Sequence, residues 1–151
     1  MESKIYDLAV IGGGPAGLTA AIYAARANLK VIIIEKENVG SLLMAHKIDN
    51  YPGFENGASG REIYEKMKLQ ALKFGAEITD GIFLDVDISQ KPRLLKTSKR
   101  NIFARTIIIA TGVTKTGGKK YPGEEEYLGK GVSYCATCDG AFFRNMKVAL
   151  F

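Results

Sequence analysis

The chain has 151 residues, of which 46% are hydrophobic and 25% are charged. This is the composition of a folded globular protein and it excludes a disordered one. The net charge is +5, but the basic residues stand singly or in pairs, as at Lys99–Arg100 and Lys119–Lys120, without interleaved aromatic residues. A nucleic-acid surface needs a basic stripe or cluster, so no nucleic acid is expected as a partner.

Residues 5–35 have the pattern of a strand, a helix and a second strand. The segments 5–11 and 29–35 are short runs rich in branched apolar residues, which is typical of buried strands. The segment 16–28 between them is rich in alanine and leucine and contains no helix breaker. Because parallel strands need a crossover connection, the sequence predicts a βαβ unit and an α/β fold.

The next segment predicts a long loop followed by a helix. Residues 39–56 show no periodicity, and loops of this length inside a compact domain are often functional. Ser59 and Glu62 then have the spacing of a capping box, in which each side chain satisfies the other residue's backbone amide. Ile63, Met67, Ala71 and Phe74 recur on one helical face, and Gly75 is the expected C-terminal cap.

Short strands follow that helix. Residues 76–78 predict a brief strand, and the segments 81–88, 93–98 and 102–109 are separated by turn residues. We expect these three segments to form an antiparallel meander. A segment rich in glycine and lysine (114–120) comes next, and residues 147–151 predict the beginning of another strand.

Glycines follow the first strand with the spacing Gly12-x-Gly14-x-x-Gly17 and open the predicted helix. Gly12 permits the tight turn, Gly14 lets the backbone approach a pyrophosphate, and Gly17 lets the helix pack closely on the strand. The helix N-terminus offers amides to phosphates. Glu35 ends the second strand, where an acid binds the ribose 2′-hydroxyl of a nucleotide without a 2′-phosphate. The alternative is a glycine-rich turn without a ligand.

The chain's two cysteines, Cys135 and Cys138, form one Cys-x-x-Cys followed by Asp139. This spacing favours redox chemistry, in which one sulfur attacks a partner disulfide and the other resolves the mixed disulfide. We expect a short helix to begin here and to favour the thiolate, with Asp139 exchanging a proton. Asp139 could also serve only as an N-terminal helix acid. Zinc is not expected, because only His46 could add a ligand.

The sequence also bears on location and on further ligand contacts. The uncharged stretch 8–25 is interrupted by glycines and a proline, so no membrane span is predicted, and no secretory signal is found. A lone Cys-x-x-Cys fits a reducing cytoplasm. Asn50 in the long loop and Thr111 after the last meander strand are candidate ligand contacts, and a simple turn is the alternative for each.

Together these motifs resemble the low-molecular-weight thioredoxin reductase family over essentially the whole chain. The resemblance is carried by the segments 12–27 (Gly-Gly-Gly-Pro-Ala-Gly-Leu-Thr-Ala-Ala-Ile-Tyr-Ala-Ala-Arg-Ala), 50–54 (Asn-Tyr-Pro-Gly-Phe), 110–112 (Ala-Thr-Gly), 122–124 (Pro-Gly-Glu) and 131–140 (Gly-Val-Ser-Tyr-Cys-Ala-Thr-Cys-Asp-Gly).

The resemblance implies a flavin-dependent disulfide oxidoreductase that passes electrons from NADPH through FAD to the cysteine pair and on to thioredoxin. Cys138 would face the flavin, Cys135 would attack thioredoxin, and Asp139 would be the proton donor and acceptor. The family's members are homodimers. The residues implied to bind FAD are Gly12, Gly13, Gly14, Pro15, Ala16, Gly17, Glu35, Gly40, Ser41, Asn50, Thr111 and Gly112.

The resemblance also implies the domain organisation. Residues 1–115 would be the N-terminal part of a Rossmann-like FAD-binding domain, with a parallel sheet and an antiparallel meander. Residues 116–151 would be a connector and the beginning of the pyridine-nucleotide domain. Family members continue into a nicotinamide domain, so this chain is expected to be a fragment without an NADPH site and with little turnover alone.

The sequence departs from the family at Val39-Gly40-Ser41-Leu42, where the family has Gly-Gly-Gln-Leu. Three alternatives stay open. The chain could be a non-catalytic nucleotide-binding module, a truncated remnant that binds no flavin, or part of a relative that uses ferredoxin or another disulfide partner.

Overall fold

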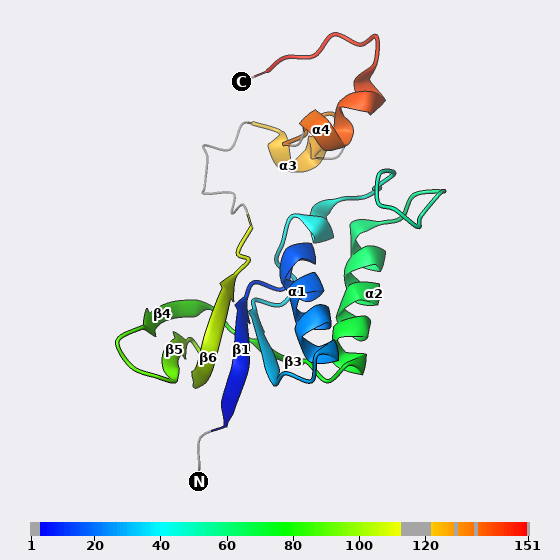
Figure 1. Cartoon of the computed structure of the whole chain (residues 1–151). Helices are drawn as coiled ribbons and strands as arrows, with labels where there is room; N and C mark the ends of the chain where they lie inside the picture. Colours follow the sequence, from blue (N-terminus) through cyan, green and yellow to red (C-terminus); the bar gives the residue numbers. More distant parts are fainter. Residues whose placement is uncertain (1–3, 113–121, 129, 135, 151) are drawn as a thin grey trace. The chain divides into compact units, whose positions relative to one another are not determined.

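The computed structural model describes residues 4–112, 122–128, 130–134 and 136–150, apart from the side chains of Thr137 and Cys138. The chain divides into two compact units, 1–114 and 115–151 (Figure 1). The stretch 114–120 and Cys135 lie outside the described residues.

A single mixed sheet forms the first unit, with the strand order β3-β2-β1-β6-β5-β4. The strands are β1 (Ile5–Ile11), β2 (Val31–Glu35), β3 (Glu77–Asp80), β4 (Phe83–Asp87), β5 (Arg93–Thr97) and β6 (Asn101–Ile109). Strands β3, β2, β1 and β6 are mutually parallel, whereas β4, β5 and β6 pair antiparallel. The α/β fold with its βαβ unit and meander is therefore confirmed, and β6 joins the two parts in one sheet.

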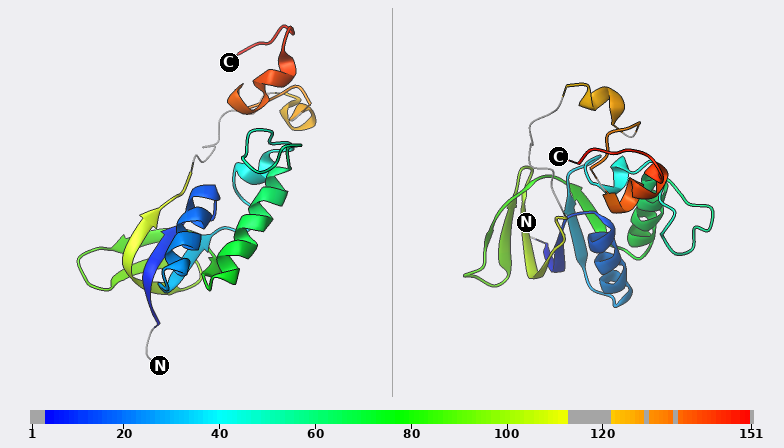
Figure 2. Two further views of the ribbon diagram at one scale, coloured as in Figure 1. Left: turned by 45° about the vertical axis from the view of Figure 1, so that its right-hand side comes forward. Right: turned by 90° about the horizontal axis from the view of Figure 1, so that it is seen from above.

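Two helices, α1 (Pro15–Arg26) and α2 (Gly60–Lys73), lie on the same side of the parallel strands (Figures 1 and 2). Side chains alternate across a strand, so Leu8 and Val10 of β1 face these helices and pack in one core with Leu18 and Ile63. This arrangement places the N-terminus of α1 directly after the end of β1.

On the opposite face of β1 and β2, side chains of the meander strands pack against the parallel strands. The other half of the β1 alternation, Ala9 and Ile11, packs in a second core with Ile32, Leu95 and Ile102. Leu95 is fully buried although it belongs to a five-residue strand near the sheet edge. Both faces of β1 and β2 are thus buried, which explains why these strands read as continuous apolar runs in the sequence.

The ends of the helices follow local signals. Ser59 Oγ accepts from the Glu62 amide at 3.1 Å, as the capping box predicts, but the Glu62 carboxylate pairs with Lys66 at 3.1 Å instead of reaching back. Gly75 has a φ of +93°, and the amides of Gly75 and Ala76 bond to the carbonyls of Leu72 and Ala71. This is the Schellman pattern that a C-terminal glycine favours.

Two predicted elements extended too far at one end. The first helix ends at Arg26 and not at Asn28, because Asn28 adopts a φ of +61° in the left-handed region, which asparagine tolerates. The second strand begins at Val31 and not at residue 29.

The second unit contains short elements. These are α3 (Glu124–Tyr127), α4 (Ala136–Asp139) and the 3₁₀ helix η2 (Gly140–Phe143). The predicted helix at the cysteine motif is confirmed as the single turn α4. The strand predicted to begin at residue 147 is wrong, because residues 147–150 form no strand. A strand needs a pairing partner, and none is found for this segment in the described part of the chain. Among the described residues, no helix is both long and apolar enough to cross a membrane.

Candidate functional site

The carboxyl ends of β1, β2 and β6 meet at one edge of the sheet, and the predicted nucleotide residues from these strands come together there. The Gly12 amide donates to the Ile34 carbonyl at 2.9 Å, and the Ala110 amide donates to the Ile11 carbonyl at 2.8 Å. These bonds hold the turn after β1 between the end of β2, which carries Glu35, and the end of β6, which leads to Thr111.

The glycines of this turn are required for different reasons. Gly12 has a φ of +110°, and a Cβ there would lie 2.2 Å from the Ala110 carbonyl oxygen. A Cβ on Gly17 would lie 1.9 Å from the Gly12 carbonyl oxygen, so only glycine lets α1 approach the turn. Both positions are closed to larger side chains by backbone atoms, which cannot move aside cheaply.

Gly14 differs, because a Cβ there would meet no atom within 4 Å and its φ is an ordinary −74°. It is the N-cap of α1, and Pro15 follows at the first helical position. The open space in front of Gly14 therefore lies at a helix N-terminus, where unpaired amides and the helix dipole favour an anion. A glycine that the protein's own packing does not require fits the close approach of a phosphate group.

Gly13 has a role that the sequence does not reveal. A Cβ at this position would lie 1.8 Å from Glu35 Oε2. The glycine therefore makes room for the Glu35 carboxylate, whose second oxygen faces the turn. This contact places the predicted acid beside the predicted phosphate turn.

Glu35 is 7% exposed, and its carboxylate is bound by two side chains of α2. Its Oε1 accepts from the Tyr64 hydroxyl at 2.9 Å and lies 3.2 Å from Lys68 Nζ, and Lys68 Nζ also donates to the Tyr64 hydroxyl at 3.2 Å. A buried carboxylate needs such partners, since an unpaired one is costly. We name Glu35, Tyr64 and Lys68 the acid cluster.

The acid cluster shifts the pKa values of its two donors. Burial, followed by the hydrogen bond to Glu35, raises the pKa of Tyr64, so the phenol stays protonated and donates. Burial alone would lower the pKa of Lys68, but its hydrogen bond to Tyr64 and the charge of Glu35 outweigh that effect and raise it. Tyr64 and Lys68 lie in the predicted helix, but the sequence did not predict them as site residues. Their spacing of four residues, beside the apolar stripe of that helix, is the one feature of the sequence that indicates a shared contact.

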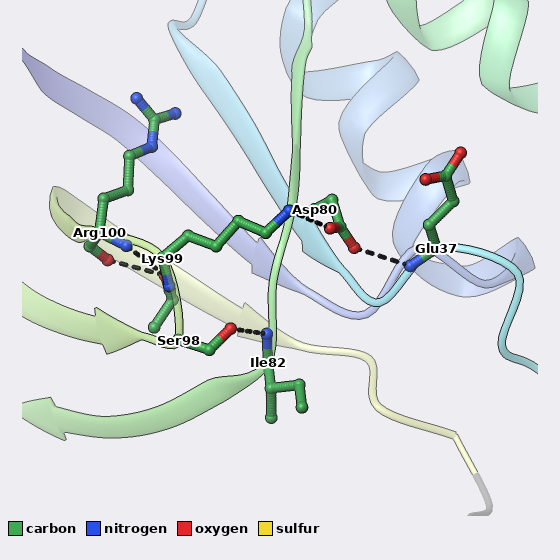
Figure 3. A network of polar contacts seen from close by, with 7 residues as sticks. Glu37, Asp80, Ile82, Ser98, Lys99 and Arg100 are labelled. Atoms are coloured by element: carbon green, nitrogen blue, oxygen red, sulfur yellow. Dashed lines mark hydrogen bonds and ion pairs between the residues drawn. The ribbon is translucent and has the colours of Figure 1, made fainter.

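The segment after Glu35 is fixed by a polar network around Asp80 at the end of β3 (Figure 3). Asp80 accepts from the Glu37 amide at 3.0 Å and from Lys99 Nζ in the turn between β5 and β6. The Ile82 amide donates to Ser98 Oγ at 3.0 Å in the same region. The meander therefore anchors the chain as it leaves β2, two residues beyond the acid.

The other predicted ligand contacts lie on exposed segments. Gly40 has a φ of +148°, and Ser41 occupies the N-cap position of the 3₁₀ helix η1 (Leu42–Met44), where its side chain makes no capping hydrogen bond. Asn50 lines an open hollow of about 280 Å³ together with residues of the segment 49–55. Thr111 and Gly112 follow β6 and are exposed. Within the described part of the chain, no hydrogen bond or ion pair joins Gly40, Ser41 or Asn50 to the glycine turn.

In the second unit, Asp139 is the described member of the predicted catalytic set. It ends α4 and is partly buried, and its Oδ2 accepts from Ser133 Oγ at 2.6 Å. Cys135 and the Cys138 side chain lie outside the described residues. The backbone of Cys138 belongs to the helical turn, as the motif predicts.

Comparison with known proteins agrees with this geometry. The family described as "Pyridine nucleotide-disulphide oxidoreductase" matches residues 6–150. A protein named thioredoxin reductase from Peptoclostridium acidaminophilum is 47% identical over 96% of this chain and 46% of its own length. One named bifunctional thioredoxin reductase/thioredoxin from Mycobacterium leprae is 44% identical over 99% of this chain and 33% of its own length.

Solved structures give the same result. The thioredoxin reductase of Streptococcus pyogenes superposes with a TM-score of 0.85 at 44% identity, and the match covers 94% of this chain and 46% of that one. The chain thus spans about half the length of the curated relatives it matches.

Proposed function

Because the chain belongs to the pyridine nucleotide-disulphide oxidoreductase family, we propose that it is the flavin-binding and dithiol-bearing part of a thioredoxin reductase-type enzyme. One observation carries the proposal. A glycine turn with an open helix N-terminus faces a buried acid, and the same chain carries a Cys-x-x-Cys followed by an acid.

The residues at the sheet edge fit the ADP half of FAD. The turn Gly12–Gly17, including Gly13, Pro15 and Ala16, would hold the pyrophosphate at the N-terminus of α1, and Glu35 would accept from the ribose. Gly40, Ser41, Asn50, Thr111 and Gly112 would lie along the rest of the cofactor. When bound, FAD supplies a reversible carrier of two electrons between a nicotinamide and a disulfide.

The dithiol performs the exchange with the partner. Cys135 thiolate attacks one sulfur of the thioredoxin disulfide, so that a mixed disulfide forms and the other thioredoxin sulfur leaves as a thiolate that takes a proton. Cys138 thiolate then attacks Cys135, which releases thioredoxin as a dithiol and leaves the Cys135–Cys138 disulfide. Asp139 lies next to Cys138 and supplies or accepts the proton, and Ser133 orients its carboxylate. Two electrons and two protons restore the dithiol.

For the whole protein we propose NADPH as the electron donor, thioredoxin as the acceptor and a homodimer as the assembly. The supporting observation is the similarity to proteins named thioredoxin reductase, one of which is named bifunctional thioredoxin reductase/thioredoxin.

An anaerobic reductive titration of the flavin-loaded 151-residue chain tests the dithiol assignment. Reduction of a flavin and a disulfide consumes four electrons per chain, whereas reduction of the flavin alone consumes two. The wild-type chain is expected to take up four electrons, and the Cys135→Ser and Cys138→Ser variants two each. Asp139→Asn serves as the control that keeps both sulfurs and should still take up four. Uptake of two electrons by the wild type would contradict the dithiol assignment.

A further inference from the structure

We propose that Tyr64 and Lys68 are positioning residues that fix the orientation of Glu35 and thereby set the chain's selectivity for a nucleotide ribose with a free 2′-hydroxyl. The inference deepens the proposed function and rests on it, because it assumes that a nucleotide binds at the glycine turn.

The two oxygens of Glu35 have different surroundings. Oε1 lies within hydrogen-bonding distance of both Tyr64 and Lys68 on α2. Oε2 lies against Gly13, at the place where any larger side chain of the turn would sit. Among the described residues, no hydrogen bond to Oε2 is found. One oxygen is therefore anchored to the helix, and the other faces the turn with its acceptor capacity available.

Two donors on one oxygen define the rotation of the carboxylate. A single donor would allow the group to pivot about that bond, whereas Tyr64 and Lys68 approach Oε1 together and also bond to each other at 3.2 Å. The three side chains are largely buried, with 7% of Glu35 and 24% of Lys68 exposed, so water competes weakly for these bonds. The donors hold Oε2 toward the turn before any ligand arrives.

The charge of the cluster matches the proposed selectivity. A carboxylate oxygen accepts strongly from a hydroxyl donor and repels a phosphate. Lys68 pairs with Oε1 and so offsets the cost of burying the carboxylate, while Oε2 keeps its acceptor capacity toward the turn. Without these partners Glu35 could turn its oxygens away from the ribose, and the preference for the 2′-hydroxyl would decline even where the fold survives.

Lys66 provides a matched control on the same helix. It pairs with Glu62 at 3.1 Å, but both side chains are about half exposed and neither contacts Glu35. Lys66→Met removes the same charge from α2 as Lys68→Met and leaves the acid cluster intact. Tyr23→Phe, at an exposed position on α1, is the corresponding control for loss of a hydroxyl.

Titration calorimetry with ADP and 2′-deoxy-ADP tests the inference on the purified chain. Loss of a hydrogen bond to a charged acceptor reduces affinity about tenfold or more, so the wild type is expected to bind ADP about tenfold more tightly than 2′-deoxy-ADP. In Tyr64→Phe/Lys68→Met this ratio should fall to about 1–2, because ADP binding weakens to the level of the deoxy ligand. The single variant Lys68→Arg, which keeps the charge and a donor, should retain most of the wild-type ratio. The controls Lys66→Met and Tyr23→Phe should keep that ratio.

The outcomes separate the two proposals. Tenfold discrimination that survives in a folded Tyr64→Phe/Lys68→Met variant overturns the inference alone. A wild type that binds both ligands equally overturns the inference together with the assignment of Glu35 to the ribose, and leaves the nucleotide site at the glycine turn standing. A wild-type chain that binds neither ligand overturns the proposed nucleotide site and this inference with it. Should the double variant not fold, Tyr64→Phe alone carries the test, since it removes one donor and leaves Lys68 in place, and it should show an intermediate ratio.

Discussion

Single residues at the glycine turn divide into those that the fold requires and those that a ligand requires. A Cβ on Gly12 or Gly17 would lie 2.2 or 1.9 Å from a carbonyl oxygen, whereas Gly14 faces open space. The spacing predicted the turn and a separate role for each of these three glycines, but it could not supply the contact that confines Gly12, because those atoms belong to residue 110, almost a hundred positions away.

A pair of alanine substitutions tests this division. Gly12→Ala combines a backbone collision with an unfavourable positive φ and should cost about 3 kcal/mol or more of unfolding free energy. Gly14→Ala should cost at most about 1 kcal/mol, the scale of a changed N-cap, yet abolish flavin binding. Urea unfolding and flavin retention measure the two effects. A Gly14→Ala variant that retains flavin like the wild type would contradict the assignment of Gly14 to the phosphates.

Helix α2 is the element that carries Tyr64 and Lys68 to Glu35. Its beginning and its end were predictable, because the Ser59 cap and the Gly75 terminus are local signals within a few residues. Its contact with Glu35 was not, because it joins residues 29 positions apart. The path of the meander is a similar case: three strands could be foreseen from turn residues, but the pairing of β6 with β1 depends on long-range packing.

The cap at Ser59 makes a measurable contribution to this helix. Ser59→Ala removes the acceptor of the Glu62 amide and should lower the free energy of unfolding by about 1 kcal/mol. Ser59→Asp keeps an acceptor and adds a favourable charge at the helix N-terminus, so it should match or exceed the wild type. Urea unfolding at neutral pH gives both values, and an alanine variant as stable as the wild type would show that water replaces the cap.

The anchor between the meander and β3 gives the chain an acid-sensitive element. The hydrogen bond from Lys99, followed by that from the Glu37 amide, lowers the pKa of Asp80 from 3.8, and the hydrogen bond from Lys4 lowers the pKa of Glu77 from 4.5. A carboxyl whose pKa is lower in the folded state contributes stability above its unfolded pKa, and this is lost as the pH falls through the folded value.

Stability should therefore decrease as the pH falls below about 4.5, where protonation of the unfolded carboxyls begins. Asp80→Asn and Lys99→Met each remove one partner of the anchor, and both should flatten the decrease below about pH 4. Urea midpoints between about pH 6 and pH 3 measure it. An unchanged slope in both variants would mean that Asp80 contributes nothing to the acid response.

At the scale of the whole molecule, two compact units carry the two halves of the proposed chemistry. The unit 1–114 holds the glycine turn and the acid cluster, and the unit 115–151 holds the cysteine motif and Asp139. The family could be inferred from motifs alone, since they are local in sequence. The proposed roles of the two sulfurs follow from the Cys-x-x-Cys motif, and the hydrogen bond from Ser133 supports the role of the Asp139 carboxylate.

The visible absorption spectrum of the purified 151-residue chain, loaded with FAD and freed of excess by gel filtration, tests the central claim most directly. We expect the protein fraction to carry the absorption bands of oxidised flavin in near-stoichiometric amount, and the Gly14→Ala variant prepared in parallel to elute colourless while folded. A folded wild-type chain that elutes without flavin would contradict the account.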